Sequence, residues 1–164
     1  MTLPGVRSFD IKKLPDERGF FAEAMRGDWA DLLEGDTIVQ ANVSMSYPGM
    51  IRAWHRHRRG QVDYFVVVKG AMKICAYDDD PNSPTHGQLD EVIASSERLQ
   101  VVRIPGKFWH GTKTVSNEPS LTMYMVNRLY DVKNPDEDRR PWNDPAVVDP
   151  RLKAPFDWNR PPHK

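Results

Sequence analysis

Three of the five histidines in this 164-residue chain lie in two short segments that could together form a reactive site. His55 and His57 form a His-x-His pair that begins six residues after Gly49, and His110 lies five residues after Pro105. Neutral imidazoles act as general bases near pH 7 and also bind transition metals. On a strand, His55 and His57 point to the same face because side chains alternate with a period of two. We therefore expect one imidazole-rich site where the two segments meet.

The elements that must position these histidines have a β pattern. Short segments of about five to ten residues alternate with turns rich in Gly, Pro, Asn and Asp. Strands at this spacing, with no helices between them, favour an antiparallel sandwich or barrel. The expected strands cover residues 8–14, 20–25, 38–47, 50–57, 62–69, 72–78, 89–95, 100–104, 111–115 and 121–127.

One helix and one irregular segment complete the expected organisation. Asp28 is a suitable N-cap and Gly35 a suitable stop for a helix over 28–34. Beyond Tyr130 the composition changes, since seven of the 14 prolines lie between positions 135 and 162. This composition predicts an irregular arm laid over the barrel rather than a second domain. The expected boundaries are a single domain over 1–164, a core over about 8–130 and an arm over 131–164.

Composition excludes several classes of protein. The formal net charge is zero, with 39% hydrophobic and 28% charged residues, which is typical of a globular protein. A neutral chain is not expected to bind nucleic acid or a membrane surface. Cys75 is the single cysteine, so no internal disulfide can form. Because the N-terminus lacks an apolar run of signal-peptide length, the expected location is the cytoplasm.

The spacing of the histidines resembles that of the cupins. In that pattern a glycine and five further residues precede His-x-His, and a later Pro and His lie on a neighbouring strand. Both halves occur here, around His55 and His110. The resemblance implies an all-β fold, an antiparallel jelly-roll β-barrel, with the short helix and Pro-rich C-terminal arm added. In a regular strand, Arg52 and Trp54 would face away from His55.

Longer stretches resemble the dTDP-4-dehydrorhamnose 3,5-epimerase family. Residues 16–23 are similar to its D-x-R-G-x-F-x-E signature, residues 40–46 to Q-x-N-x-S-x-S and residues 50–55 to V-L-R-G-L-H. Residues 83–87 resemble S-P-T-F-G, and Glu137 with residues 142–145 resembles E-x4-W-N-D-P. The matched segments follow the family order from about residue 8 to residue 146.

The resemblance implies inversion of carbon centres beside the C4 ketone of a deoxysugar carried on a nucleoside diphosphate. Inversion needs a base on one face of the sugar, an acid on the other and a donor for the enolate oxygen. By resemblance, His55 is the base and Tyr124 the acid. Arg52 and His110 are expected close to the ketone or the diphosphate. No cofactor is implied.

Further residues are expected to bind the nucleotide sugar. Arg18, Phe21 and Glu23 match positions that hold the nucleotide in the family, usually from the partner subunit, so a homodimer is implied. The other expected substrate-binding residues are Gln40, Asn42, His57, Gln61, Tyr130 and Glu137.

Three departures from the family pattern concern the catalytic centre. Asp63 stands where the family has a lysine that holds the enolate oxygen, and an inward-pointing carboxylate would oppose the enolate charge. The C-terminal aspartate that pairs with the family's base is missing, and Asp149 and Asp157 are candidates for its replacement. His57 occupies a position that is not histidine in the family. A further hypothesis is that Asp63 lies beside His55 and His57 and supports the base.

Three alternatives stay open at this point. A metal-dependent cupin enzyme would use His55, His57 and His110 as ligands, with Gln61 or Asp63 as the fourth, a set that suits Zn, Mn, Fe or Ni. A sugar-nucleotide 3,4-ketoisomerase would share the R-x-x-H-x-H pattern without a metal. A sugar-nucleotide-binding protein without activity is the third. The epimerase, with no metal and no cofactor, is the preferred interpretation.

Overall fold

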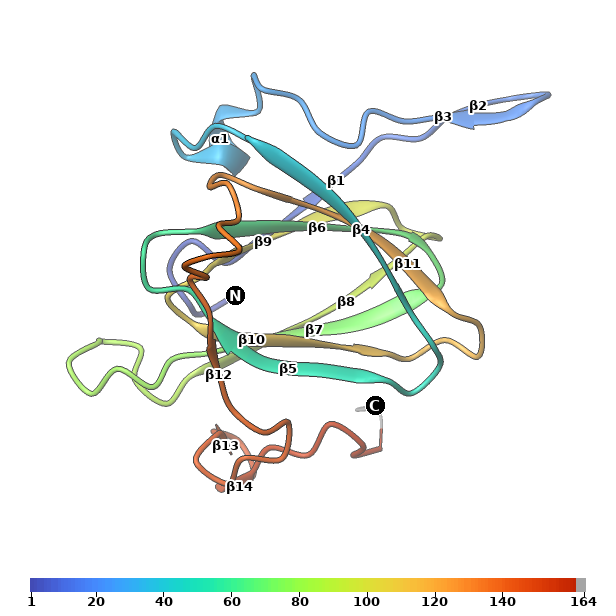
Figure 1. Cartoon of the computed structure of the whole chain (residues 1–164). Coiled ribbons are helices and arrows are strands. Elements are labelled where there is room, and N and C mark those ends of the chain that lie inside the picture. The colour runs from blue at the N-terminus through green and yellow to red at the C-terminus, as the bar shows by residue number, and fades with distance from the viewer. Residues whose placement is uncertain (162–164) are drawn as a thin grey trace.

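A computed structural model describes residues 1–161, which form fourteen strands and one short helix. Most strands belong to two five-stranded antiparallel sheets that face each other (Figure 1). The fold confirms the predicted antiparallel jelly roll. In spatial order, the first sheet contains β1 (Arg7–Asp10), β9 (Gln100–Pro105), β6 (Val62–Lys69), β11 (Ser120–Val126) and β4 (Gln40–Ser46). The second contains β12 (Asp138–Arg139), β5 (Ile51–Arg56), β10 (Trp109–Thr114), β7 (Ala71–Tyr77) and β8 (Leu89–Ser95).

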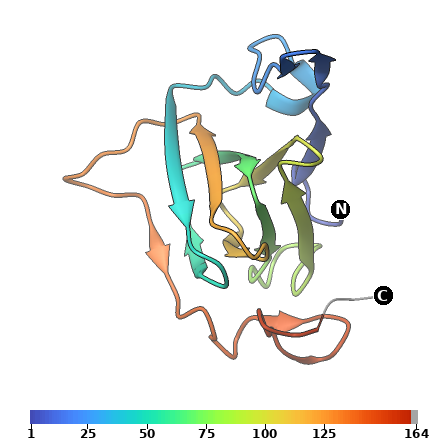
Figure 2. The same cartoon turned by 90° about the vertical axis from the view of Figure 1, so that its right-hand side faces the viewer.

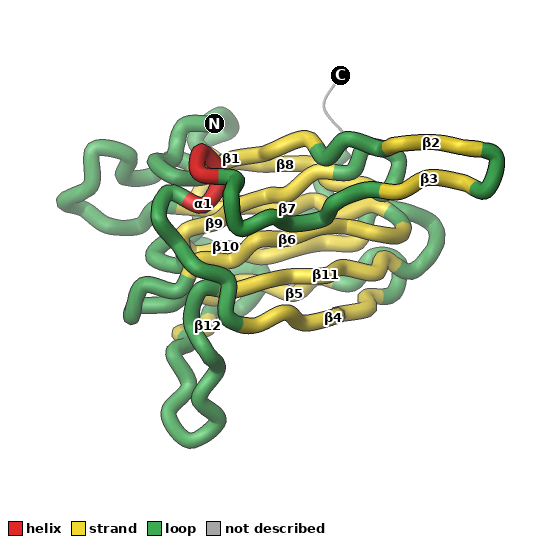
Figure 3. The backbone as a smooth tube through the Cα atoms, turned by 90° about the horizontal axis from the view of Figure 1, so that it is seen from above, coloured by secondary structure: helices red, strands yellow, loops and turns green. Residues whose placement is uncertain are grey.

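The remaining strands form two small hairpins. One joins β2 (Leu14–Asp16) to β3 (Gly19–Phe21), and the other joins β13 (Val148–Asp149) to β14 (Ala154–Pro155). The expectation of one strand over 8–14 is wrong. The chain leaves the first sheet after β1, so β2 can pair with β3 in a separate hairpin that extends beyond the sheets (Figure 3).

The helix α1 (Ala30–Leu33) is shorter than the segment predicted over 28–34. Its N-cap residue is Trp29 and no side chain caps it, so the prediction for Asp28 is wrong. The carboxylate of Asp28 instead accepts hydrogen bonds from Arg26, at 2.8 and 2.6 Å. The helix remains attached because Leu32 and Leu33 are buried on the outer face of the first sheet.

Three apolar clusters hold the layers together. The central cluster lies between the two sheets and includes Phe65 and Ile74. A second cluster joins the helix to the outer face of the first sheet. The third joins the C-terminal arm to the outer face of the second sheet, where Trp54 contacts Phe156 and Trp158. Burial of each such aromatic side chain stabilises the fold by about 2–3 kcal/mol.

The segment after β11 is the predicted irregular arm. It runs along the open edge of the second sheet as β12 and then turns beneath the barrel (Figure 2). Strand β12 pairs with β5, where Asp138 lies opposite Arg56 and Arg139 opposite His55. The arm therefore lies directly beside the histidine segment. Across residues 1–161, no helix has the length and apolar composition needed to cross a membrane.

Candidate active site

A cavity of about 620 Å³ opens between the two sheets. One wall is β4, whose residues Gln40, Asn42, Ser44 and Ser46 all line the cavity because alternate side chains share a face. Val43, between two of these residues, is exposed on the opposite face. Polar side chains that face the interior of a barrel do not form a hydrophobic core, but they can bind a polar ligand.

The bottom of the cavity is shaped by an irregularity in β5. His55 pairs with His110 of β10, but Arg52 pairs with Thr112, so three steps along β5 match two along β10. Such a bulge shifts the alternation of side chains by one residue. Arg52 and His55 consequently both line the cavity, and the expectation that they face apart is wrong.

The bulge is accommodated by a glycine on the neighbouring strand. A Cβ added to Gly111 would lie 2.3 Å from Cβ of Ala53, closer than two carbon atoms can approach. Trp54, the other bulged residue, packs against Phe156 and Trp158 of the arm. The residue next to His110 must therefore be glycine for His110 and His55 to stay opposite each other.

The three histidines meet as the sequence predicts. The ring centroids of His55 and His110 are 4.2 Å apart, those of His57 and His110 5.4 Å, and those of His55 and His57 5.9 Å. One ring nitrogen of each lies within 4.8 Å of the others, which also makes this the candidate metal-binding set. His110 is fully buried, whereas His55 and His57 line the cavity.

Asp63 points inwards and is only 3% exposed. Its Oδ2 atom lies 3.0 Å from Nε2 of His110 and 3.4 Å from Nε2 of His57, and its Oδ1 accepts a 2.9 Å hydrogen bond from Gln61. Among residues 1–161 its polar contacts do not include His55. The hypothesis that Asp63 lies beside His57 is confirmed, but a direct pair with His55 is not formed.

His110 has a polar neighbour at each ring nitrogen. Its Nδ1 lies 2.8 Å from the carbonyl oxygen of Phe108, which can only accept, so Nδ1 carries a proton. Its Nε2 faces Oδ2 of Asp63 at 3.0 Å. Although burial raises the pKa of Asp63, its interactions with His110 and His57 outweigh this and lower it. Asp63 and His110 therefore form a buried pair in which a carboxylate lies against an imidazole.

The pair affects the three other titratable groups of the cavity. Burial and the nearby His110 lower the pKa of His55 well below its usual value, so His55 is neutral at pH 7. Burial lowers the pKa of His57, but its interactions with Asp63 and Asp136 together outweigh burial and the net shift is upwards. Burial and the charge of Asp63 raise the pKa of Tyr124, which stays protonated. The cavity thus contains a neutral imidazole and a protonated phenol.

The cavity between the two sheets thus contains a possible base and a possible acid. Comparisons with known proteins are consistent with such a site. The family model described as dTDP-4-dehydrorhamnose 3,5-epimerase matches residues 1–149. The chain belongs to this family.

Individual relatives agree with this assignment. A probable low-salt glycan biosynthesis epimerase of Haloferax volcanii is 42% identical over 86% of this chain and 91% of its own length. The spore coat polysaccharide biosynthesis protein SpsL of Bacillus subtilis is 33% identical over 96% of this chain and 97% of its own. The crystal structure of a Legionella pneumophila 3,5-epimerase in complex with dTDP-4-keto-L-rhamnose is 29% identical, with a TM-score of 0.80 over 90% of this chain and 78% of that one.

Most residues matched to the family motifs lie in the cavity. Arg52 donates a 2.8 Å hydrogen bond from Nε to Oγ of Ser46, which fixes its guanidinium at the wall. Gln40 donates to Asn42 at 2.8 Å and accepts from the backbone N–H of Tyr130 at 2.9 Å. The predicted site residues that line the cavity, including His57 and Asp63, which depart from the family pattern, are Gln40, Asn42, Arg52, His55, His57, Gln61, Asp63, Tyr124, Tyr130 and Glu137.

The N-terminal signature does not reach the cavity of its own chain. Arg18 is 84% exposed at its side chain and pairs with Asp16, in the β2–β3 hairpin. Phe21 ends the same hairpin and is exposed, and Glu23 pairs with Arg26. Their expected role at a neighbouring subunit's site stays a prediction.

Neither candidate for the missing C-terminal aspartate lines the cavity. Asp149 is buried in the arm, where Arg160 donates to it at 2.8 Å and its pKa is lowered, against the effect of burial, by hydrogen bonds with Arg151. Asp157 accepts from the backbone N–H of Asn159 in a local turn. Asp63 is the buried carboxylate closest to the histidines by these contacts.

The arm contributes residues that the sequence pattern did not indicate. Nδ1 of His57 donates to the backbone oxygen of Asp136, and Arg139 and Arg140 line the cavity beside Glu137. The E-x4-W-N-D-P motif pointed to this segment through Glu137. The role of its neighbours could not be predicted, because β12 has only two residues and so shows no alternation of side chains.

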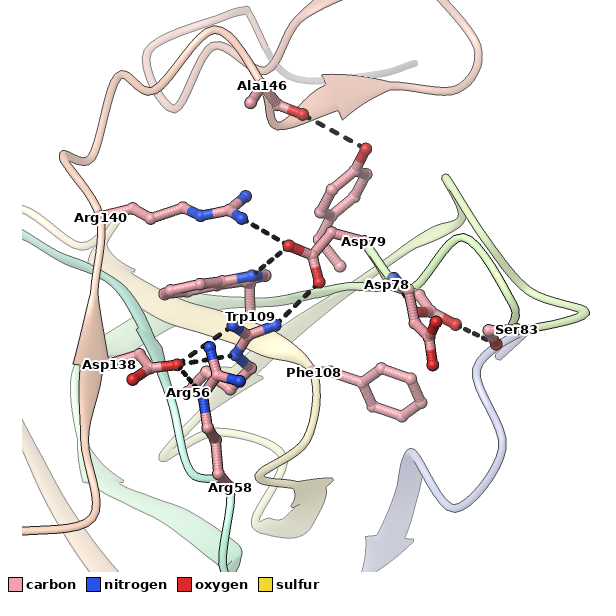
Figure 4. Close-up of polar contacts among 12 residues, drawn as sticks. Arg56, Arg58, Asp78, Asp79, Ser83, Phe108, Trp109, Asp138, Arg140 and Ala146 are labelled. Atoms are coloured by element: carbon pink, nitrogen blue, oxygen red, sulfur yellow. Dashed lines mark hydrogen bonds and ion pairs between the residues drawn. The ribbon is translucent and has the colours of Figure 1, made fainter.

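A clasp, formed by Arg56, Asp79, Trp109, Asp138 and Arg140, holds the arm in place (Figure 4). The Trp109 ring lies between two guanidinium groups, 4.3 Å from Arg56 and 4.1 Å from Arg140. Asp79 binds both arginines and accepts from Nε1 of Trp109 at 2.7 Å. Asp138 of the arm accepts from Arg56. The clasp fixes β12 beside His55.

Proposed function

We propose that this protein epimerises a 4-keto-6-deoxy sugar linked to a nucleoside diphosphate, by proton transfer next to the C4 ketone. The observation that carries the proposal is that a neutral imidazole and a protonated phenol share one polar cavity. His55 lies on β5 of the second sheet and Tyr124 on β11 of the first. Because the sheets face each other, a sugar ring between them presents one face to each group.

His55 takes the proton from the carbon beside the ketone, and Tyr124 returns one to the opposite face. A low pKa leaves His55 unprotonated before the substrate arrives, as a base requires. A raised pKa keeps the phenol of Tyr124 able to donate. Acid–base groups of this kind each contribute about 10²–10⁴-fold in rate.

The enolate oxygen is stabilised by Arg52, whose guanidinium lines the cavity and has neutral hydrogen-bond partners. The carboxylate of Asp63 is 3% exposed and lies against two imidazoles, His110 at 3.0 Å and His57 at 3.4 Å. The family's lysine is thus replaced by a buried carboxylate that contacts histidines. One of these, His110, packs against His55.

The nucleotide is bound in part by a second copy of the chain. The exposed β2–β3 hairpin carries Arg18 and ends in two exposed aromatic residues, Phe20 and Phe21. Contiguous exposed apolar side chains on a protein surface favour association. A symmetric homodimer in which each hairpin reaches the other cavity would place Arg18, Phe21 and Glu23 at the nucleotide.

The nucleotide is proposed to be thymidine diphosphate, as in the Legionella complex. The test is incubation with dTDP-4-keto-6-deoxyglucose in deuterated water, followed by mass and proton spectra. Deuterium at C3, or at C3 and C5, with an inverted centre supports the proposal. A product whose carbonyl has moved to C3 indicates a ketoisomerase, and binding without exchange indicates a non-catalytic protein. Either of those two outcomes overturns the proposal.

A further inference from the structure

Arg52, Arg139 and Arg140 line the cavity, and they differ in how far their charge is already satisfied. Arg140 belongs to the clasp, where Asp79 binds its guanidinium and Trp109 stacks on it (Figure 4). Arg52 lies against the wall, where its Nε donates to Ser46. Arg140 is therefore a structural cation, and Arg52 is placed for the sugar ketone.

Arg139 is the exception among the three. Its side chain is 78% exposed although it lines the cavity, and its ion pair is with Glu137, at 2.8 Å. An ion pair this exposed is weak, because water screens it and the long side chain loses entropy when held. The guanidinium of Arg139 can therefore exchange its partner, or add a second one, at little cost.

The backbone of Arg139 is nevertheless fixed. Arg139 lies directly opposite His55 in the β12–β5 pairing. The backbone N–H of Arg140 donates to the oxygen of Trp54 at 2.9 Å, and the adjacent Asp138 is bound by Arg56 in the clasp. The exposed guanidinium of Arg139 thus extends from a fixed backbone position, one strand away from the imidazole of His55.

We propose that Arg139 binds the diphosphate of the substrate and so positions the sugar between His55 and Tyr124. This inference rests on the proposed function, since it takes the sugar carbons to lie at His55. The diphosphate is attached to C1 of the sugar and extends away from the ring, and the largely exposed guanidinium of Arg139 lines the same cavity. A guanidinium can donate two parallel N–H groups to a phosphate. The family motif E-x4-W does not specify the residue at this position.

The test compares Arg139→Ala and Arg139→Lys with the control Arg98→Ala. Arg98 is similarly exposed, at 72%, and is paired with one carboxylate, Asp10, away from the cavity. Calorimetry on each purified protein, in whatever oligomeric state it has, measures its affinity for dTDP and for thymidine. Steady-state kinetics with dTDP-4-keto-6-deoxyglucose gives kcat and KM.

We expect Arg139→Ala to weaken dTDP binding about tenfold to a hundredfold, the loss typical of a charge-assisted hydrogen bond, and to leave thymidine binding unchanged. KM should rise by a similar factor while kcat changes little, Arg139→Lys should be intermediate, and Arg98→Ala should match wild type. If the wild-type protein epimerises the keto sugar but Arg139→Ala binds dTDP as tightly as wild type, this inference alone is overturned. If the wild-type protein binds dTDP through Arg139 but exchanges no proton of dTDP-4-keto-6-deoxyglucose, the proposed function alone is overturned. A wild-type protein that neither binds dTDP nor reacts with the keto sugar overturns both.

Discussion

The carboxylate of Asp63 lies 3.0 Å from Nε2 of His110, and both side chains are buried beneath the cavity. Nδ1 of His110 donates to the backbone oxygen of Phe108, so Nε2 is the nitrogen that faces Asp63. His110 in turn packs against the ring of His55, with 4.2 Å between the ring centroids. Asp63 and His110 are accordingly positioning residues, which act through the base.

Asp63→Asn should lower kcat by about a hundredfold or more, since loss of a preorganised charge costs this much in comparable sites. The amide removes the carboxylate charge that faces His110 and His57 beside His55. Affinity for dTDP should change little, because Asp63 is only 3% exposed and offers almost no surface to the nucleotide. Asp90→Asn is the matched control, since Asp90 is also a buried carboxylate but binds backbone N–H groups outside the cavity. Equal kcat values for wild type and Asp63→Asn would reject this role.

Asp63→Lys, which restores the family's residue, should not recover activity. The new ammonium would replace a carboxylate beside His57, whose pKa is raised, and buried like charges are strongly unfavourable. Kinetics with dTDP-4-keto-6-deoxyglucose provides the check. A lysine variant that epimerises this substrate faster than wild type would show that Asp63 marks a redirected site.

His55→Ala and His55→Asn should abolish proton exchange, because His55 is the neutral imidazole that faces the proposed sugar position. Binding of dTDP should survive, since the nucleotide is held by other residues. Deuterium uptake measured by mass spectrometry separates these two properties. Exchange at nearly the wild-type rate would remove His55 from the mechanism.

The pH at which kcat/KM falls on the acidic side should lie below the usual pKa range of histidine. Burial and His110 lower the folded-state pKa of His55, so the base stays unprotonated as the pH falls through about 6.5, the ordinary value for histidine. The profile of kcat/KM, which reports the free enzyme, should therefore be flat from pH 7 to below 6.5 and decline only in more acidic solution. A half-maximal point at or above pH 6.5 would contradict this assignment.

The purified protein should contain no stoichiometric transition metal. A metal bound by His55, His57 and His110 would occupy the lone pair that His55 needs as a base. Elemental analysis is the measurement, with activity tested before and after a chelator. Near one equivalent of Zn, Mn, Fe or Ni, with activity lost on chelation, would support the metal-cupin alternative.

Sedimentation should show that the chain forms a dimer at micromolar concentration. We also expect each subunit to contribute residues to the cavity of its partner. A mixture of His55→Ala and Arg18→Ala subunits, co-refolded at equal amounts, tests this directly. If Arg18 serves the partner's cavity, one site of each mixed dimer is intact, so activity should return to about a quarter of wild type when half the dimers are mixed. If Arg18 serves its own cavity, both sites of a mixed dimer are impaired and nothing is recovered.

Local sequence determined the features that depend on short-range periodicity. Strands 62–69 and 89–95 lie where predicted, and the placement of Tyr124 and the polar face of β4 follows from alternation with a period of two. The His-x-His pair and His110 could be assigned to one site because the jelly roll pairs their two segments. The motifs, read in order, were enough to indicate the family.

Tertiary structure decided the contacts that join distant segments. Arg52 faces the cavity with His55 because the bulge depends on how β5 pairs with β10, a register that no residue of β5 encodes by itself. Asp63 binds His110, 47 positions away along the chain. Arg139 reaches the cavity because the clasp fixes an arm without periodicity. Side-chain alternation is a local property of the backbone, whereas register and ion pairing are set by packing between segments.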